Sequence, residues 1–290
     1  MGVAWMFGSS LAFIAVNGIV RHLGTDLPTA QSAFLRFLLG LVFLLPALRT
    51  VALSRFPART WRLFGLRGAI HSVAVVLWFY AMARIPVAEV QAIGYLNPIG
   101  VTLGAALLFG ERLALRRILA IAVAMLGALV ILRPGLRELS PGHFAQLGAA
   151  ICFAGSYLTM KKLSDLAPAG VVVAMMSVTV ALFLAPFAIA VWVPPTGAQY
   201  LGLFATALFA TLAHYSMTRA FRVAPVSVTQ PVTFLQLIWA SLLGLLMFGE
   251  PVDPFVILGG VMIIAAISYI TWREARLKRG ATPPVNAAKQ

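Results

Sequence analysis

Two stretches of this chain carry the same pattern. Residues 81–111 read AMARIPVAEVQAIGYLNPIGVTLGAALLFGE, and residues 220–250 read AFRVAPVSVTQPVTFLQLIWASLLGLLMFGE. Both stretches begin an apolar run with Pro-Val, place a Gln four residues after the Val, and close the run with Phe-Gly-Glu. Each run is about as long as the roughly 20 apolar residues that a helix needs to cross a bilayer. The pattern therefore predicts a membrane-spanning helix in each half of the chain, built from a duplicated unit.

The duplication extends beyond these two helices. At an offset of 140 residues the earlier parts of the halves also match, in the pairs Gly8 and Gly148, Phe13 and Phe153, Leu23 and Leu163, Pro28 and Pro168, and Pro46 and Pro186. We therefore predict two units, residues 1–140 and 141–272, followed by a basic cytoplasmic tail over residues 273–290. The tail contains Arg, Lys, Gly and Pro without a long apolar run, so we expect it to be disordered.

The composition is that of a membrane protein. Of the 290 residues, 61% are hydrophobic and 10% are charged, whereas about 25% of residues are charged in soluble domains. Because so few charges cannot cover a surface in water, most of the surface must face lipid. We predict an all-α polytopic protein with ten transmembrane helices. The predicted spans are Val3–Val20, Thr29–Leu48, Arg62–Ala83, Val87–Phe109, Arg117–Leu132, Phe144–Met160, Ala169–Val193, Gln199–Ala220, Val226–Phe248 and Pro254–Thr271.

The basic residues are distributed unequally between the two sides of these spans. Of 22 Lys and Arg residues, 17 fall on one side and 4 on the other, and Arg36 lies inside a span. Positively charged loops stay in the cytoplasm, so we expect both chain ends there, in a bacterial inner membrane. A net charge of +14 would suggest nucleic acid in a soluble protein. Here the charges lie in short loops, so no nucleic-acid partner is expected. The sequence does not predict an oligomeric state.

Each predicted unit holds five spans, which is an odd number, so the second copy enters the membrane from the opposite face. Inverted repeats of this kind are common in secondary transporters. Two copies that face opposite ways can form one central cavity, which opens alternately to either side of the membrane. Channels also use inverted repeats, so the repeat alone does not separate a carrier from a passive pore.

The repeated motifs resemble a known family. The segments that carry the resemblance are Phe34–Leu39, Pro86–Ala88, Phe109–Leu113, Ala220–Val226 and Phe248–Pro251. They are similar to the drug/metabolite transporter superfamily, in its EamA-type ten-helix branch, and the resemblance covers nearly the whole chain. It implies export of small metabolites through a cavity lined by the third, fourth, eighth and ninth spans, with the fifth and tenth spans outside. The aromatic amino-acid exporters of this superfamily are one possible branch.

Two glutamines at matching positions are candidate substrate ligands. Gln91 and Gln230 lie on polar helix faces, the first shared with Tyr95 and Thr102, the second with Thr233. A buried amide without a partner costs several kcal/mol in hydrocarbon, so both faces should point into protein or water. The two side chains would line a substrate cavity, or else form hydrogen bonds between helices.

Histidines and aromatic residues with polar tips gather in the spans expected to line the cavity. His71 and His214 could carry protons or bind a carboxylate, although an intramembrane histidine is more often a neutral hydrogen-bonding group. The aromatic residues that could stack on a substrate are Trp78, Tyr95, Tyr215 and Trp239. Their alternative role is an interfacial belt or ordinary packing.

Arg36 lies inside the second span, where an arginine costs about 2.5–3.5 kcal/mol. We expect a structural role in which Arg36 pairs with Asp26 or Glu89, or reaches the periplasm. Glu111 and Glu250 close the two matching motifs. We expect each of them to cap a helix or to pair with a nearby arginine rather than to bind substrate.

Motifs for other functions are missing from the sequence. It contains no G-x-x-x-x-G-K-[ST] motif for ATP hydrolysis, no HExxH, and no His/Cys cluster that could hold a metal. The single cysteine, Cys152, cannot form a disulfide within the chain. We therefore expect neither a metal nor a cofactor, and no enzymatic activity.

All eight acidic residues fall in loops, near span ends or in the tail. A proton-driven exporter of cations needs a carboxylate within the membrane, so a zwitterionic or neutral substrate, moved by uniport or weakly coupled exchange, is favoured. The leading hypothesis is a secondary exporter of small metabolites, above all amino acids including aromatic ones. The alternatives are an exporter of other neutral metabolites or drugs, a nucleotide-sugar carrier, a passive channel and a membrane-embedded enzyme.

Overall fold

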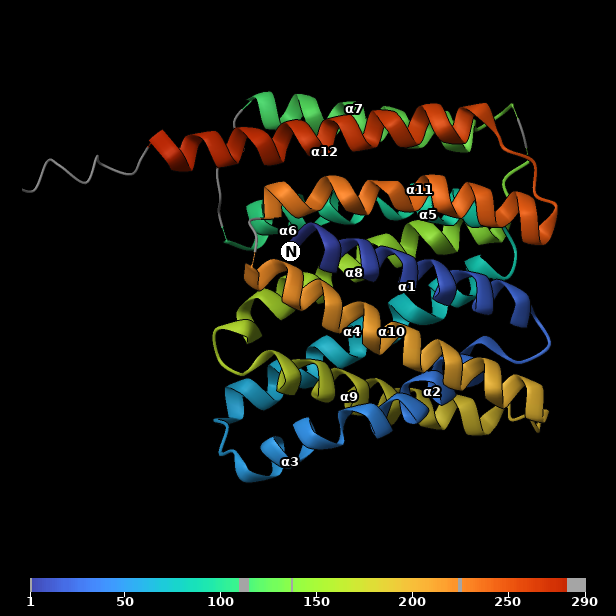
Figure 1. Cartoon of the computed structure of the whole chain (residues 1–290), viewed down its shortest axis with the longest axis vertical. Helices are drawn as coiled ribbons and strands as arrows, with labels where there is room; N and C mark the ends of the chain where they lie inside the picture. Colours follow the sequence, from blue (N-terminus) through green and yellow to red (C-terminus); the bar gives the residue numbers. More distant parts are fainter. Residues whose placement is uncertain (1, 110–114, 137, 224–225, 281–290) are drawn as a thin grey trace, which may run out of the picture.

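The computed structural model describes residues 2–109, 115–136, 138–223 and 226–280, and these are almost entirely helical. Figure 1 shows helices that lie side by side with their axes roughly aligned. The helices are α1 (Gly2–Leu23), α2 (Thr29–Gly40), α3 (Leu45–Leu53), α4 (Ala58–Met82), α5 (Val87–Gly94), α6 (Asn97–Phe109), α7 (Leu115–Leu132), α8 (Pro141–Ser164), α9 (Ala169–Ala190), α10 (Gly197–Val223), α11 (Val226–Phe248) and α12 (Pro254–Gly280). A 3-10 turn over Leu41–Leu44 joins α2 to α3.

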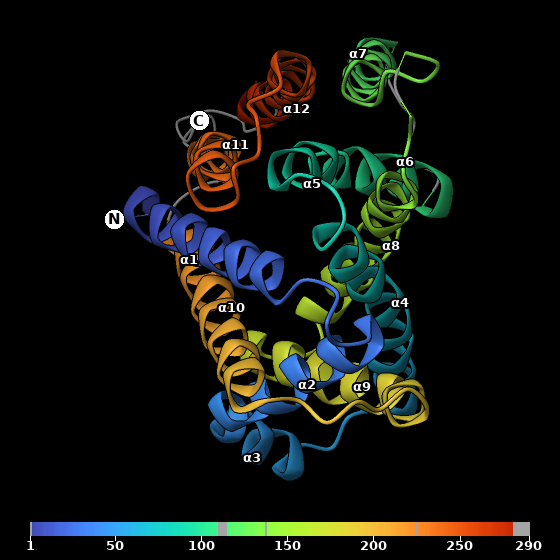
Figure 2. The same ribbon diagram turned by 90° about the vertical axis from the view of Figure 1, so that its right-hand side faces the viewer.

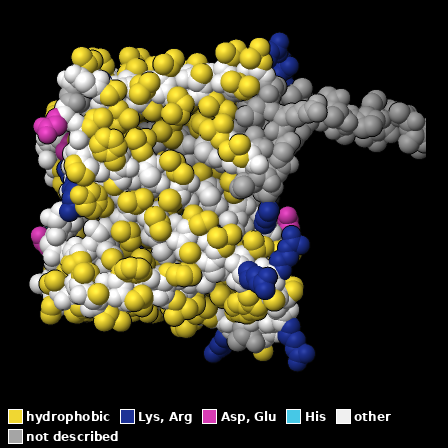
Figure 3. Space-filling view, turned by 180° about the vertical axis from the view of Figure 1, so that it is seen from behind, with side chains coloured by type: hydrophobic (Ala, Val, Ile, Leu, Met, Phe, Trp, Pro, Cys, Tyr) yellow, Lys and Arg dark blue, Asp and Glu magenta, His cyan; other side chains and the backbone are white. Residues whose placement is uncertain are grey.

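These elements make the ten predicted passes through the bundle, because α2 and α3 form one pass and α5 and α6 form another. The predicted all-α fold class is confirmed. Within the described residues, the segments long and apolar enough to span a membrane are Gly2–Leu23, Thr29–Val51, Ala58–Met82, Gly170–Ala190 and Pro254–Arg273, and Ile118–Leu132 and Val232–Phe248 are shorter apolar helices. Figure 3 shows hydrophobic side chains across one face of the bundle, with Lys and Arg mostly at one end.

The fourth pass is broken where the sequence predicts one continuous helix. α5 ends at Gly94 and α6 begins at Asn97, and between them the backbone tightens into three-residue turns. The cause is Pro98 in the first turn of α6, because proline lacks the N–H that would bond the carbonyl four residues earlier. The polar face expected to run from Gln91 to Thr102 is therefore interrupted.

The most extensive helix contacts join one half of the chain to the other. α1 packs along α10, α8 along α4, α2 against α9, and α7 against α12. Under the inverted repeat, the α1–α10 pair is the counterpart of the α8–α4 pair, and the other two pairs are their own counterparts. Figure 2, which looks along the helices, shows α7 and α12 at one edge of the bundle and α2, α3 and α9 at the opposite edge.

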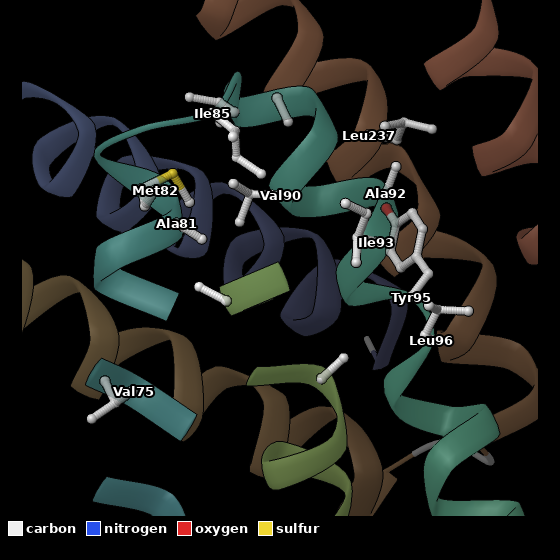
Figure 4. Close-up of a cluster of buried hydrophobic side chains, with 14 of the residues drawn as sticks. Val75, Ala81, Met82, Ile85, Val90, Ala92, Ile93, Tyr95, Leu96 and Leu237 are labelled. Atoms are coloured by element: carbon white, nitrogen blue, oxygen red, sulfur yellow. The ribbon is translucent and has the colours of Figure 1, made fainter. Parts of the chain in front are cut away.

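Small side chains and a mixed apolar core hold these pairs together. Gly127 of α7 faces Gly259 of α12, and a Cβ on Gly127 would lie 2.7 Å from the Gly259 carbonyl oxygen. Neither glycine can therefore take a side chain unless the two helices separate. Figure 4 shows part of the core, in which residues of α4, α5 and α11 meet: Ala81, Met82, Val90, Ala92, Ile93 and Leu237.

Both ends of the described chain lie at the same end of the bundle, since α1 begins and α12 ends there (Figure 1). α12 continues to Gly280, so the first residues of the tail predicted to be disordered from Arg273 onward are helical. Arg, Glu, Ala, Leu and Lys in this segment favour a helix, and Gly280 is a typical helix stop. Residues 281–290 lie outside the described part of the chain.

Ionic contacts tie helices together at the other end of the bundle. Arg21 at the end of α1 lies 2.6 Å from a Glu250 carboxylate oxygen and donates to the Met82 carbonyl oxygen at 3.1 Å. The second Glu250 oxygen accepts a hydrogen bond of 2.9 Å from the Val87 backbone N–H. The role expected for Glu250, helix capping and pairing with an arginine, is therefore confirmed. Its counterpart Glu111 lies outside the described residues.

Candidate functional site

A chain of neutral hydrogen bonds crosses the middle of the bundle between α1, α5 and α11. Asn17 Nδ2 donates to Gln91 Oε1 at 3.3 Å, and Gln91 Nε2 donates to Gln236 Oε1 at 3.0 Å. Gln236 Nε2 in turn donates to the Ser10 hydroxyl at 3.4 Å. We call these four residues the amide chain. It joins helices of both repeats, and each amide donor in it has an acceptor, as hydrocarbon surroundings demand.

Tyr95 extends the polar contact between α5 and α11. Its hydroxyl lies 3.3 Å from the carbonyl oxygens of Thr233 and Phe234, and its ring packs edge-on against the Phe234 ring, with 5.6 Å between centroids. Tyr95 is buried beside Leu237 (Figure 4). The break after α5 places Tyr95 there, since an uninterrupted helix would aim its side chain differently.

A second polar group, which we call the basic cluster, consists of Arg36 on α2, Arg67 and His71 on α4, and His214 on α10. Arg67, Arg36 and His214 all lie close enough to His71 to act on it electrostatically. His71 Nδ1 is 3.1 Å from the Ser156 hydroxyl, and Arg67 Nη1 donates to the Val172 carbonyl oxygen at 2.9 Å. No described carboxylate joins this cluster.

Aromatic rings surround the two histidines. The His71 ring lies edge-on between Phe37, at 5.8 Å, and Phe153, at 5.2 Å. The His214 ring meets Phe13 at 5.2 Å, and its Nδ1 is 2.7 Å from the Ala210 carbonyl oxygen. Phe13 and Phe153 are counterparts in the two repeats. The two histidines thus occupy related, apolar-walled positions in the inverted copies.

A cavity opens beside the basic cluster, between α2, α9 and α10. Arg36, Ser177, Thr211 and His214 are its polar lining. Its volume of about 20 Å³ leaves room for about one water molecule. A wider groove of about 370 Å³ lies between α7 and α12, but none of the predicted site residues lines it.

The other predicted aromatic residues are dispersed. Trp78 of α4 packs on Phe79 at 5.3 Å, at the edge of the main core. Trp239 of α11 meets Phe7 with 6.5 Å between ring centroids, and its buried indole N–H has no hydrogen-bond partner in the described part of the chain. Tyr215 is 54% exposed on the outer face of α10. The predicted set is therefore not one continuous cavity wall in this structure.

Gln230 lies in the helical segment of α11, but its side chain is outside the part of the chain that the structure describes. The hydrogen-bond partner of Gln91 on α11 is Gln236 instead. The sequence pattern indicated Gln230 as a candidate ligand because it occupies the position equivalent to Gln91 in the second repeat. Hydrogen bonding depends on how α5 meets α11 in space, and a repeat offset does not predict that geometry.

The expected pairing of Arg36 with Asp26 or Glu89 is wrong. Glu89 lies 2.8 Å from His143 Nε2 at the start of α8, and Asp26 is exposed. The Arg36 guanidinium carbon instead lies 4.0 Å from the Phe37 ring centroid. An acidic side chain can be listed from sequence, but helix rotation decides which cation it reaches.

Sequence reasoning also missed Arg67, which it counted among the 17 cytoplasmic charges, in the opening turns of the third predicted span. Arg67 is only 4% exposed, because α9 covers this part of α4 and the Val172 carbonyl oxygen accepts from its guanidinium. The available signal was its spacing: Arg67 lies four residues before His71, on the same helix face. Within the described residues, no group of three or more His, Cys, Asp or Glu side chains could hold a metal.

Comparisons with known proteins support transport. The riboflavin transporter of Vibrio cholerae is 28% identical over 96% of this chain and 95% of its own length. The S-adenosylmethionine uptake transporter of Rickettsia prowazekii is 26% identical over 95% of this chain and 94% of its own length. The pseudopaline exporter CntI of Pseudomonas aeruginosa is 28% identical over 96% of this chain and 97% of its own length.

A solved structure described only as "Crystal structure of protein" superposes with a TM-score of 0.65, at 19% identity, over 96% of this chain and 98% of that chain. At that identity it supports the fold alone. The model of the EamA-like transporter family matches the chain twice, over residues 1–133 and 140–272. This match confirms the predicted two-repeat fold and the resemblance to the EamA-type branch. The chain belongs to the EamA-like transporter family, and it is a multi-pass membrane transporter of small metabolites, not an enzyme.

Proposed function

We propose that this chain carries small metabolites that join an aromatic ring to a polar or zwitterionic group, outward across the bacterial inner membrane, with aromatic amino acids as the leading substrates. The observation that carries the proposal is that polar side chains of both repeats meet inside the bundle, in the amide chain and the basic cluster. Aromatic rings beside both histidines could stack on a flat substrate. Riboflavin and S-adenosylmethionine, which name two of the relatives, both contain flat ring systems.

The proposed mechanism is alternating access. The helix pairs that enclose the two polar groups each join one repeat to the other, so an exchange of conformation between the inverted copies would exchange the open side. The bonds of the amide chain would have to loosen on one face during this exchange. We propose that Gln91, Gln230 and Trp78 contact the substrate while the cavity is open.

Outward flux is the finer part of the proposal, since the names of the relatives include both uptake and export. Each buried carboxylate in the described residues already has a basic partner, Glu89 with His143 and Glu250 with Arg21. No such residue is then available to couple a proton gradient at mid-membrane. A carrier without that coupling follows the substrate gradient, so a metabolite made inside the cell would leave it.

Counterflow into liposomes tests this function. Purified protein is reconstituted with unlabelled L-phenylalanine or L-tryptophan inside, and entry of the labelled amino acid is followed, with riboflavin as a third substrate. We expect saturable, trans-stimulated flux of at least one amino acid. Gln91→Ala, Gln230→Ala and Trp78→Ala should each lower the rate about tenfold, the effect of losing roughly 1.4 kcal/mol of substrate binding.

Gln199→Ala is the matched control, because Gln199 is half-buried in the first turn of α10, where its side-chain oxygen accepts a hydrogen bond from the Thr196 backbone N–H and touches neither polar group. Flux that rises linearly with concentration and shows no trans-stimulation would indicate a channel. Saturable flux of riboflavin alone would replace the amino acids as substrates. Wild-type rates in all three variants would reject the proposed contacts.

A further inference from the structure

Neither arginine of the basic cluster has a carboxylate partner among the described residues, and the buried Arg67 Nε also lacks an acceptor there. Arg67 donates to a backbone carbonyl oxygen, but within the described residues no oxygen accepts a hydrogen bond from the Arg36 guanidinium. The guanidinium lies over the neighbouring Phe37 ring and acts electrostatically on His71 and His214. An arginine inside a membrane bundle is unfavourable unless a counter-charge or hydrogen-bond acceptors surround it.

The acidic residues of the described chain are engaged or distant. Glu89 pairs with His143, Glu250 with Arg21, and Asp253 with Arg133. The remaining described carboxylates whose exposure is known lie in water-exposed loops, and they are Asp26, Glu138 and Asp165. No described part of the protein therefore supplies the anion that Arg36 lacks.

The surroundings of Arg36 favour an anion that enters from outside. The guanidinium borders the cavity between α2, α9 and α10, next to the Ser177 and Thr211 side chains. The Thr211 hydroxyl donates a hydrogen bond to the Ala207 carbonyl oxygen, whereas the Ser177 hydroxyl has no hydrogen-bond partner among the described residues and can donate to a ligand. His214 is the remaining polar side chain of the lining, and the other walls are apolar, with Phe37 and Met176 among them. A charge-assisted bond in such walls is stronger than in water.

We propose that this cavity is the subsite for the carboxylate of the transported molecule, with Arg36 as its main ligand and Ser177 as a second donor. A planar guanidinium matches a carboxylate through two parallel hydrogen bonds. The cavity as it stands, about 20 Å³, admits about one water molecule, so it must widen to take the carboxylate, and the bulkier, more highly charged phosphate would need a larger opening. The inference rests on the proposed function, because it assigns one end of an amino-acid-like substrate.

The proposed subsite also explains why the chain has an arginine at position 36, where a charge inside the bundle is unfavourable. A structural arginine would be expected to stabilise the empty protein, whereas a ligand-binding arginine destabilises the empty protein and is compensated only on binding. The two roles therefore predict opposite signs for the change in thermal midpoint when the charge is removed. That sign separates them without knowledge of the natural substrate.

The test measures the thermal midpoint of the purified full chain by tryptophan fluorescence, at constant ionic strength, with three probes. The probes are sodium benzoate, the uncharged analogue benzamide, and sodium phosphate. We expect saturating benzoate to raise the midpoint of the wild-type protein by about 2–4 °C, and benzamide and phosphate to leave it unchanged. Arg36→Gln should abolish the benzoate effect and raise the midpoint of the ligand-free protein.

Arg84→Gln is the matched control. Arg84 is exposed just after α4, with its guanidinium over the Tyr80 ring, so this variant should keep the benzoate response. A lower midpoint for ligand-free Arg36→Gln, or an equal benzoate response in that variant, would overturn the proposal. Stabilisation by phosphate but not by benzoate would overturn the choice of carboxylate.

Failure of this inference is distinguishable from failure of the proposed function. If the subsite is right and amino acids are wrong, benzoate still binds through Arg36 while phenylalanine and tryptophan counterflow are absent. If amino acids are right and the subsite is wrong, saturable phenylalanine flux persists in Arg36→Gln, and L-phenylalaninamide competes as well as L-phenylalanine. With the subsite in place, we expect the amide to compete about tenfold more weakly.

Discussion

Two arginines only 15 residues apart in the chain have opposite surroundings. Arg21, at the end of α1, has a carboxylate partner in Glu250 at 2.6 Å and a carbonyl acceptor in Met82 at 3.1 Å. Arg36, in the middle of α2, has a neighbouring ring and a cavity but no acceptor among the described residues. Arg21 therefore has its counter-charge within the fold, whereas Arg36 has none among the described residues.

The difference separates polar residues that hold helices together from those available to a substrate. Arg21 and Glu250 connect the ends of α1, α4 and α5 to the loop before α12. The amide chain resembles this arrangement, because its donors already have acceptors. Among the described residues, Arg36 of the basic cluster combines a charge that has no acceptor with an adjacent cavity. A polar group that has no partner inside the protein can form new bonds with a substrate and so contribute to its binding.

The largest effect is expected from a mutation that places a carboxylate beside Arg36, so that both arginines have a counter-charge within the protein. Ser177→Asp places a carboxylate on the wall that Arg36 shares, at a high effective concentration. We expect stability to rise by roughly 2–3 kcal/mol, seen as a higher thermal midpoint. Amino-acid counterflow should fall by more than about tenfold, because the internal carboxylate competes with the substrate.

Ser177→Asn is the control for Ser177→Asp, since it has nearly the same shape without the charge. It should not raise the midpoint. If Ser177→Asp unfolded more easily than Ser177→Asn, Arg36 would already be compensated in the native protein, and the contrast with Arg21 would be lost.

Removing the counter-charge of Arg21 should change the stability by a smaller amount and in the opposite direction. Glu250→Gln keeps an acceptor for the Val87 N–H but leaves Arg21, which is 20% exposed, without its counter-charge. We expect a loss of about 1–2 kcal/mol and a lower thermal midpoint. Glu138→Gln, on an exposed side chain of the loop before α8, should not change the midpoint. Equal midpoints for both variants would show that the Arg21 contact contributes nothing to stability.

The inverted repeat extends this prediction to the other end of the bundle. At the repeat offsets, Glu111, Lys161 and Val226 are the counterparts of Glu250, Arg21 and Val87. The side chains of the first three lie outside the described residues. If the copies exchange conformation during transport, each set would close one end of the carrier. Both Glu111→Gln and Glu250→Gln should then slow counterflow, and we expect their rates to agree within about threefold. A wild-type rate in Glu111→Gln would argue against equivalent roles.

The amide chain offers a third, weaker test. A double-mutant cycle of Gln91→Ala and Gln236→Ala measures the coupling across their 3.0 Å hydrogen bond. We expect about 0.6–1.7 kcal/mol, the range of interhelical hydrogen bonds in membranes. Gln91→Ala with Gln199→Ala, which are in separate surroundings, should be additive. Additivity in the first pair would mean that the bond is not maintained in the membrane.

The passes and the duplicated halves could be predicted from sequence because apolar run length and residue offset are one-dimensional properties. Pro98, which breaks the fourth pass, was visible as a residue, but its effect on the position of Tyr95 depends on the helix that packs there. Gln91 was correctly expected to avoid lipid. Its bond to Gln236 could not be derived, since offset symmetry does not set the rotation of α11 against α5.

The charged residues show the same limit. Arg36 was recognisable as unusual because a charge inside an apolar run is costly, but its lack of a carboxylate partner became evident only when Glu89 was found with His143. Arg67 was counted with the cytoplasmic charges because it lies in the opening turns of its span, whereas α9 covers it in the fold. Periodicity indicates which residues share a face, and packing decides what that face meets.

The smallest predicted effect concerns Tyr215, which the sequence placed among the substrate contacts. It is 54% exposed and lies against Trp5, with 6.2 Å between the ring centroids, on the outer face of α10. His214, its neighbour in sequence, faces the cavity instead, because adjacent residues on a helix point about 100° apart. We therefore expect Tyr215→Ala to keep counterflow within about twofold of wild type, since it removes no contact near the basic cluster. His214→Ala in the same assay should lower the rate clearly, and if Tyr215→Ala were the more damaging of the two, the substrate path would run outside the cavity beside Arg36.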